Sequence, residues 1–132
     1  MSEIKIVSID IDGTLINDRH EITPEVKRAV QAAMAQGVKI VITTGRPLPG
    51  VQKILSELNI TGSDQYVITY NGGLVQTADG QKTLFRQPLA VSEFQKINAF
   101  MTAQQIYVQV ESHDAAYTTN HLSLIHISEP TR

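Results

Sequence analysis

The chain has 132 residues, of which 42% are hydrophobic and 18% charged, a composition typical of a folded domain rather than a disordered chain. Its formal net charge of −2 argues against nucleic acid or an anionic membrane as a partner, and no apolar stretch is long enough to span a bilayer. The absence of cysteine excludes disulfides and thiolate metal sites, so any metal needs oxygen or imidazole ligands. We expect a cytoplasmic protein without a signal peptide, because the first residues lead directly into a strand-like run.

Strands and helices alternate in the first part of the sequence. Apolar, β-branched runs predict three buried strands, at residues 4–9, 38–43 and 66–70. A helix is expected from the N-cap Thr23 to about Gly37, and a second one over residues 48–58. This order predicts an α/β fold with a Rossmann-like parallel sheet and right-handed crossovers.

The pattern changes after the third strand. Three further features follow there: a hairpin of residues 74–76 and 83–85, a helix at 91–103 and a strand at 106–111. We interpret residues 1–85 as the N-terminal part of a core domain. Residues 86–121 would then begin a second, inserted α/β unit.

Two aspartates, Asp10 and Asp12, follow the first strand directly. Residues two apart in an extended chain point to the same side, so both carboxylates would converge beyond the carboxyl end of the sheet, where ligands bind in such folds. Oxygen ligands of this kind suit Mg²⁺, held by Asp10 and Asp12. Asp10 could then attack phosphorus as a nucleophile, with Asp12 as general acid and base. The main chain of Ile11, through its carbonyl or its amide, would face the phosphate and the metal.

Polar residues also follow the second and third strands. Thr44 and Gly45 offer a hydroxyl and a main-chain N–H near a helix start, which is a natural phosphate cradle, although Thr44 could also be a simple N-cap. Arg46 would orient the loop or touch the substrate, or else be an ordinary exposed arginine. Asn71 opens a turn after the third strand and is a candidate for substrate binding or loop positioning.

The segment Ile9–Leu15, read as Ile-Asp-Ile-Asp-Gly-Thr-Leu, resembles the first motif of the haloacid dehalogenase superfamily. Thr44-Gly45-Arg46 resembles its second motif, and the order of features is similar to the Cof-type subgroup, whose members carry an inserted cap of type IIB. The resemblance implies a Mg²⁺-dependent phosphatase of small phosphorylated metabolites, such as sugar phosphates. It also implies that the cap selects the substrate.

Two motifs implied by this resemblance have no counterpart in the chain. The family's third motif is a lysine that stabilises the phosphoryl group, and its fourth is an acidic cluster that completes the metal site. Both follow the cap, and neither Lys82, Lys96 nor Asp114 lies in the matching context. The alternative interpretations are therefore a non-catalytic truncated fragment or a phospho-accepting receiver domain, although a receiver would carry an aspartate where Asn71 stands.

The last eleven residues, 122–132, resemble the in-frame translation of a transposase-type adapter used in sequencing libraries. We therefore expect the native sequence to end at about residue 121. The alternative is a natural C-terminal strand and tail.

Overall fold

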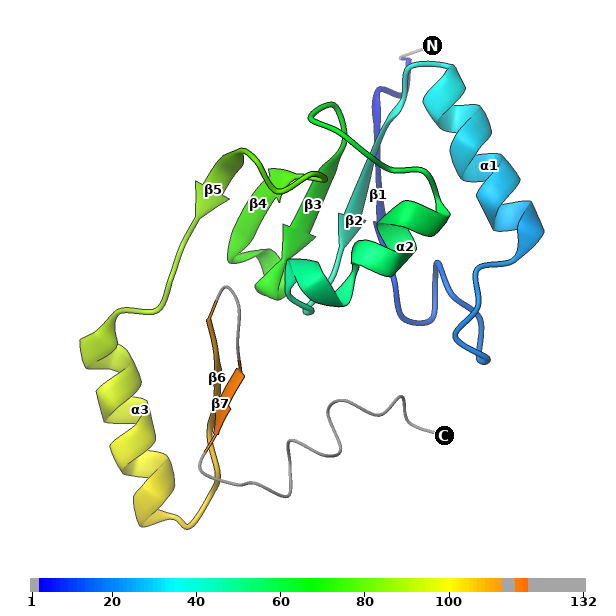
Figure 1. Cartoon of the computed structure of the whole chain (residues 1–132). Coiled ribbons are helices and arrows are strands. Elements are labelled where there is room, and N and C mark those ends of the chain that lie inside the picture. Colours follow the sequence, from blue (N-terminus) through cyan, green and yellow to red (C-terminus); the bar gives the residue numbers. More distant parts are fainter. Residues whose placement is uncertain (1–2, 113–115, 119–132) are drawn as a thin grey trace. The chain divides into compact units, whose positions relative to one another are not determined.

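A computed structural model of the chain describes residues 3–112 and 116–118 (Figure 1). The chain divides into two compact units, Met1–Gln87 and Pro88–Arg132. The sequence predicts this division two residues earlier, after residue 85. The last eleven residues, for which an adapter origin is predicted, lie outside the described residues. No helix among the described residues has the length and apolar character needed to cross a membrane.

The first unit is built on a five-stranded sheet with the order β1-β2-β3-β4-β5. Its strands are β1 (Ile6–Asp10), β2 (Lys39–Thr43), β3 (Tyr66–Thr69), β4 (Leu74–Thr77) and β5 (Thr83–Arg86). The first three are parallel, as the sequence predicts, and the β4–β5 hairpin adds to the sheet in antiparallel pairing. β1 lies at one edge of this sheet, and Ile4 and Ile6 there are 68% and 61% exposed.

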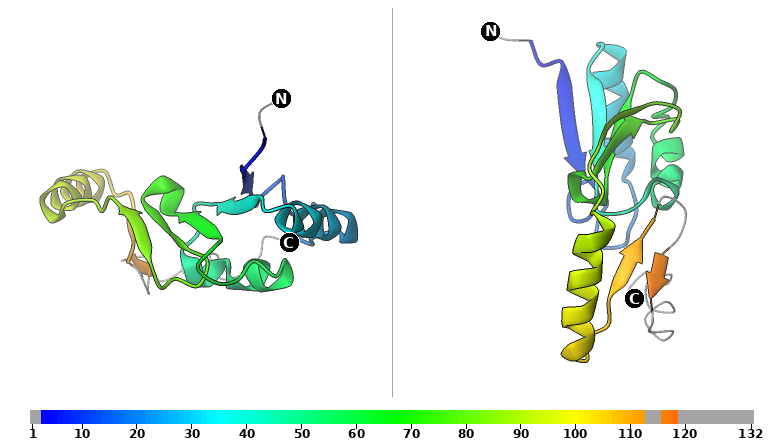
Figure 2. Two further views of the ribbon diagram at one scale, coloured as in Figure 1. Left: turned by 90° about the horizontal axis from the view of Figure 1, so that it is seen from above. Right: turned by 90° about the vertical axis from the view of Figure 1, so that its left-hand side faces the viewer.

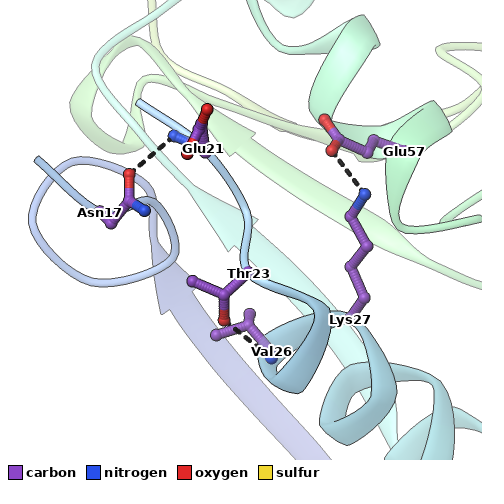
Figure 3. Close-up of polar contacts among 6 residues, drawn as sticks. All are labelled: Asn17, Glu21, Thr23, Val26, Lys27 and Glu57. Carbon is purple, nitrogen blue, oxygen red and sulfur yellow. Dashed lines mark hydrogen bonds and ion pairs between the residues drawn. The ribbon is translucent and has the colours of Figure 1, made fainter. Parts of the chain in front are cut away.

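Helix α1 (Pro24–Ala35) begins as the sequence predicts, because the Thr23 side chain accepts a hydrogen bond from the Val26 N–H at 3.4 Å (Figure 3). The crossovers from β1 to β2 and from β2 to β3 advance in the same direction, so right-handed connections place their helices on one face of the sheet. The ribbon views of Figure 2 show both helical segments beside the sheet. An ion pair between Lys27 Nζ and Glu57 Oε1, 2.7 Å apart, joins them (Figure 3).

The second predicted helix forms in two pieces, so the expectation of a continuous helix was wrong. A 3₁₀ turn at Leu48–Gly50 is followed by α2 (Gln52–Glu57). Pro49 can donate no N–H and Gly50 is a poor helix former, so the chain makes one tight turn before the α-helix begins. The predicted apolar face is nevertheless retained, because Val51 and Leu55 are buried.

The core of the first unit lies between these helices and the sheet. Twelve buried apolar residues form it: Ile11, Leu15, Ile16, Ile22, Val30, Ile40, Ile42, Val51, Leu55, Leu58, Ile60 and Val67. Three of them, at positions 11, 15 and 16, belong to the loop after β1. The burial of these three apolar side chains therefore stabilises the position of the polar segment that carries the two aspartates.

The second unit contains α3 (Val91–Ala103) and a two-stranded antiparallel sheet of β6 (Gln109–Glu111) and β7 (Ala116–Thr118). The helix has the bounds that the sequence predicts. The strand expected at 106–111 is shorter, because the Ile106 N–H still bonds to the Met101 carbonyl at 2.9 Å while Gln105 adopts a φ of 57°. This is the cap of a helix C-terminus, so the chain becomes extended only after it.

Candidate active site

Three parallel strands end side by side at one edge of the sheet. In the strand register Asp10 of β1 is paired with Thr43 of β2, and Thr43 is paired with Ile68 of β3. The loops that follow these strands therefore leave the sheet next to one another. They carry all the residues for which the sequence predicts a function: Asp10, Ile11, Asp12, Thr44, Gly45, Arg46 and Asn71.

The loop after β1 folds back on the main chain of Ile11. The Ile11 carbonyl accepts hydrogen bonds from the N–H groups of Thr14, Leu15 and Ile16, at 3.4, 3.1 and 3.1 Å. Gly13, with a φ of 76°, makes the reversal possible. Of the two Ile11 groups that we expected to face the ligand, the carbonyl is thus engaged within the turn.

The two aspartates project from a loop whose apolar side chains are buried. Ile11 and Leu15 are 0% and 2% exposed, whereas Asp10 and Asp12 are both exposed. Alternation along the chain thus places the carboxylates outward and the aliphatic side chain between them inward. Both carboxylates are accessible to a ligand at the edge of the sheet.

The loop after β2 presents a buried hydroxyl. Thr44 is 5% exposed, and its N–H donates to the Ile68 carbonyl at 2.9 Å, so its main chain continues the β2–β3 pairing by one residue. Its Oγ1 accepts the Arg46 N–H at 3.1 Å. Because that oxygen acts as an acceptor within the loop, the hydroxyl hydrogen is left to donate to a ligand. The interpretation of Thr44 as a helix N-cap is wrong, because the next helical turn begins at Leu48 with Pro47 as its N-cap, and the Thr44 hydroxyl instead closes a turn with Arg46.

Two contacts tie the three loops together. The Arg46 guanidinium donates through Nη2 to Asp12 Oδ1 at 2.7 Å, linking the second loop to the first. The Asn71 N–H donates to the Thr44 carbonyl at 3.2 Å, linking the third loop to the second. Sequence analysis singled out Arg46 and Asn71 but did not foresee the ion pair with Asp12. The signal available for it was opposite charge at two strand ends that the predicted sheet makes neighbours.

The described side chains at this edge supply some, but not all, of the ligands that a hard cation such as Mg²⁺ needs. Asp10 and Asp12 supply carboxylate oxygens of the kind that Mg²⁺ prefers, and Mg²⁺ is commonly bound by one or two carboxylates together with phosphate and water. Within residues 3–112 and 116–118, no three His, Cys, Asp or Glu side chains gather where they could hold a metal ion. The described part of the chain thus contributes two acidic groups to such a site.

Several known proteins are similar to this chain in sequence or in fold. YxeH of Bacillus subtilis (strain 168) is 60% identical over 72 residues, which is 54% of this chain and 27% of that protein. A protein of Streptococcus pyogenes serotype M6 is 38% identical over 117 residues, covering 89% of this chain and 44% of its own length. Both carry provisional phosphatase assignments. The solved structure of the subclass IIB sugar phosphatase BT4131 superposes with a TM-score of 0.72 at 25% identity, over 94% of this chain and 48% of that one.

The chain thus spans less than half the length of these relatives. The sequence model of the haloacid dehalogenase-like hydrolases matches residues 7–131, nearly the whole chain. The parallel-dominated sheet is that of this fold. The chain belongs to the haloacid dehalogenase-like hydrolase family.

Proposed function

We propose that the full-length protein is a Mg²⁺-dependent phosphatase of small phosphorylated metabolites, and of sugar phosphates in particular. The observation that carries this proposal is the register of Asp10, Thr43 and Ile68, because it gathers two carboxylates, a hydroxyl and a glycine N–H at one edge of the sheet. The phosphatase assignments of the relatives and the sugar phosphatase among the similar structures support the same activity.

The reaction would take place in two steps. A carboxylate oxygen of Asp10 attacks phosphorus, the bond from phosphorus to the ester oxygen breaks, and that oxygen takes a proton from the Asp12 carboxyl group. Asp12, now ionised, removes a proton from a water molecule, which attacks the phosphorus of the aspartyl phosphate. The bond from phosphorus to Asp10 breaks, which releases inorganic phosphate. Asp10 is then again a carboxylate, and Asp12 is again a protonated carboxyl group.

The transferring phosphoryl group would be held by main-chain and hydroxyl donors. We assign the Thr44 hydroxyl, the Gly45 N–H and the Ile11 N–H to its non-bridging oxygens. Donors that are fixed before the substrate arrives stabilise the developing charge without reorganisation, and the hydrogen bond from Arg46 N–H to Thr44 Oγ1 supplies that rigidity here. No charged side chain is needed for these contacts.

Asp10 would hold the Mg²⁺, joined by Asp12 when the Asp12 carboxyl group is ionised. The ion would screen the negative charges of nucleophile and phosphate, which otherwise repel each other. We expect the 132-residue chain to be inactive by itself, because its described residues bring only these two acidic groups to the site and its sequence has no lysine at the family's third motif. The second unit, from Pro88 onward, is assigned as the beginning of the cap that selects the substrate.

The test is a hydrolysis assay of the full-length protein against p-nitrophenyl phosphate and a panel of sugar phosphates, with Mg²⁺ or with EDTA. Activity should require Mg²⁺ and should be lost in Asp10→Asn, which retains the shape of the side chain but not its nucleophilic charge. Asp12→Asn should lose nearly as much. Substantial turnover by Asp10→Asn would overturn the assignment of the nucleophile. A wild-type protein inactive on every phosphomonoester would overturn the function itself.

A further inference from the structure

The turn after β3 has an unusual backbone. Tyr70, Asn71 and Gly72 follow one another with φ angles of 52°, 53° and 96°. A left-handed conformation costs an L-residue roughly 1–2 kcal/mol, and of these three residues only asparagine and glycine tolerate it readily. Strain of this kind persists where the surroundings enforce it, and it is concentrated at functional sites. Contacts with neighbouring residues must therefore stabilise this turn.

The Asn71 main chain and side chain both meet the loop after β2. The Asn71 N–H donates to the Thr44 carbonyl at 3.2 Å. A Cβ atom placed on Gly45 would lie 2.9, 3.3 and 3.4 Å from Oδ1, Nδ2 and Cγ of Asn71, and these are the three nearest atoms. The Asn71 carboxamide thus occupies the place that a side chain at position 45 would take.

This contact explains why position 45 is a glycine. Gly45 is not in the left-handed region, so its backbone would accept another residue without strain. The atoms nearest to such a side chain are those of the Asn71 carboxamide, which would have to shift. Conversely, any movement of that carboxamide leaves the Thr44–Gly45 segment without its lateral support.

We propose that Asn71 is a positioning residue that holds Thr44 and Gly45 in their phosphate-binding conformation. This inference depends on the proposed role of those two residues as phosphate ligands. Asn71 acts through them, by its hydrogen bond to Thr44 and by the packing of its carboxamide on Gly45. The neutrality of the carboxamide matters as well, because an aspartate of the same shape would place a negative charge beside the bound phosphate.

The experiment measures the binding of inorganic phosphate to the full-length protein by calorimetry in the presence of Mg²⁺. Four proteins form a double-mutant cycle: the wild type, Gly45→Ala, Asn71→Gly and the double variant. Asn71→Gly retains the freedom to adopt a positive φ while removing the carboxamide, and Gly45→Ala displaces the carboxamide. Asn71→Asp retains the shape and the left-handed preference and adds only a charge.

Asn59 provides the matched control. It is also an exposed asparagine with a positive φ, 56°, but it lies before β3 rather than after it. Asn59→Gly and Asn59→Asp therefore test the loss of a left-handed asparagine and the gain of a charge away from the strand ends. Both control variants should bind phosphate as the wild type does.

We expect Asn71→Gly and Gly45→Ala each to weaken phosphate binding about tenfold, as is usual for a residue that supports a ligand-binding group. The double variant should also lose about tenfold rather than about 100-fold, because both changes remove one contact. Asn71→Asp should bind phosphate more weakly than Asn71→Gly. It also serves as the second variant if Asn71→Gly fails to fold.

Losses that multiply in the double variant would overturn the inference, because Asn71 would then act independently of Gly45. Wild-type affinity in Asn71→Gly would overturn it too, because the residue would then serve the turn alone. If the wild type binds phosphate but hydrolyses no phosphomonoester, the proposed function fails while the binding cycle still decides this inference. If the wild type binds no phosphate, both are overturned.

Discussion

The guanidinium of Arg46 lies 2.7 Å from the carboxylate of Asp12, from its Nη2 to Oδ1, and so joins the loops that follow β2 and β1. The side chains are 41% and 57% exposed, and an exposed ion pair contributes little to stability, typically about 0–1 kcal/mol. Its value is geometric, because it fixes one rotamer of the residue that we assign as general acid and base.

Replacing Arg46 should therefore affect catalysis more than stability. In the full-length protein we expect Arg46→Gln to lower kcat/KM about tenfold, because the Asp12 side chain loses the partner that orients it. Arg46→Lys retains the charge without the fork-shaped guanidinium, so its kcat/KM should lie between those of the wild type and of Arg46→Gln. The check is steady-state kinetics together with thermal unfolding. An unchanged kcat/KM in Arg46→Gln would reduce the contact to an ordinary surface ion pair.

Thr44 should contribute through its hydroxyl. Thr44→Ala removes one donor to the phosphoryl group and should lower kcat by about 10²-fold, whereas Thr44→Ser retains the donor and should keep most of the activity. The same substitution removes the acceptor of the Arg46 N–H, so a loss of about 1 kcal/mol in the free energy of unfolding is also expected. A variant that loses stability but keeps its kcat would show that Thr44 only caps the loop.

The β4–β5 hairpin should weaken in acid because of Asp79. The Thr77 hydroxyl and the Gln81 N–H donate to its Oδ1 at 2.5 and 3.0 Å, and these bonds lower the pKa of the Asp79 carboxyl group, the first of them most. A folded-state pKa below the unfolded one gives stability that is present above the unfolded pKa and lost as the pH falls through the folded one.

Asp79→Asn should accordingly lower the unfolding temperature of the full-length protein near neutral pH. The difference from the wild type should be smaller at pH about 3 than at pH about 7, because the wild-type carboxyl group becomes protonated as the pH falls towards its lowered pKa. Thermal unfolding followed by circular dichroism at both pH values is the measurement. A difference that stays constant with pH would contradict the role of the charge.

The origin of the last eleven residues can be settled on the source DNA. A single long read across codon 121 should continue in frame for about 140 residues, the length expected from a core plus a cap, and should contain a lysine and a late acidic cluster. The opposite result is a frame that ends at Arg132, and the family match as far as residue 131 makes this a real alternative. That result would favour a non-catalytic fragment over an enzyme.

The sequence predicts those parts of this molecule that depend on neighbouring residues. The three parallel strands and the start of α1 follow from local patterns: β-branched runs, and the cap formed by Thr23. The placement of the polar strand ends at one edge follows from the parallel order alone. The expectation of a continuous second helix was wrong because the apolar spacing of residues 51–58 is helical, whereas Pro49 and Gly50 just before it favour a separate tight turn.

The sequence places opposite charges at neighbouring strand ends but does not specify which side chains make contact there. The ion pair of Arg46 with Asp12 depends on the rotamers of two long side chains from different loops, and no spacing in one loop encodes it. The left-handed turn at Tyr70 and Asn71 was expected to begin one residue later, since tyrosine has no intrinsic preference for positive φ. The turn is accompanied by contacts of Asn71 with Thr44 and Gly45 and by a hydrogen bond from the Gly73 N–H to the Tyr70 carbonyl, none of which is encoded in the local sequence.

The position of β1 at the sheet margin has a consequence for the proposed nucleophile. Among the described strands, β1 pairs with β2 alone, so Asp10 ends a strand that is supported from one side. Strands held in this way open locally at a lower free energy than central ones. In the 132-residue chain, the position of Asp10 is therefore coupled to the local opening of β1. Substitutions at exposed positions of this strand, such as Ile6, should then change how often the strand opens in this chain.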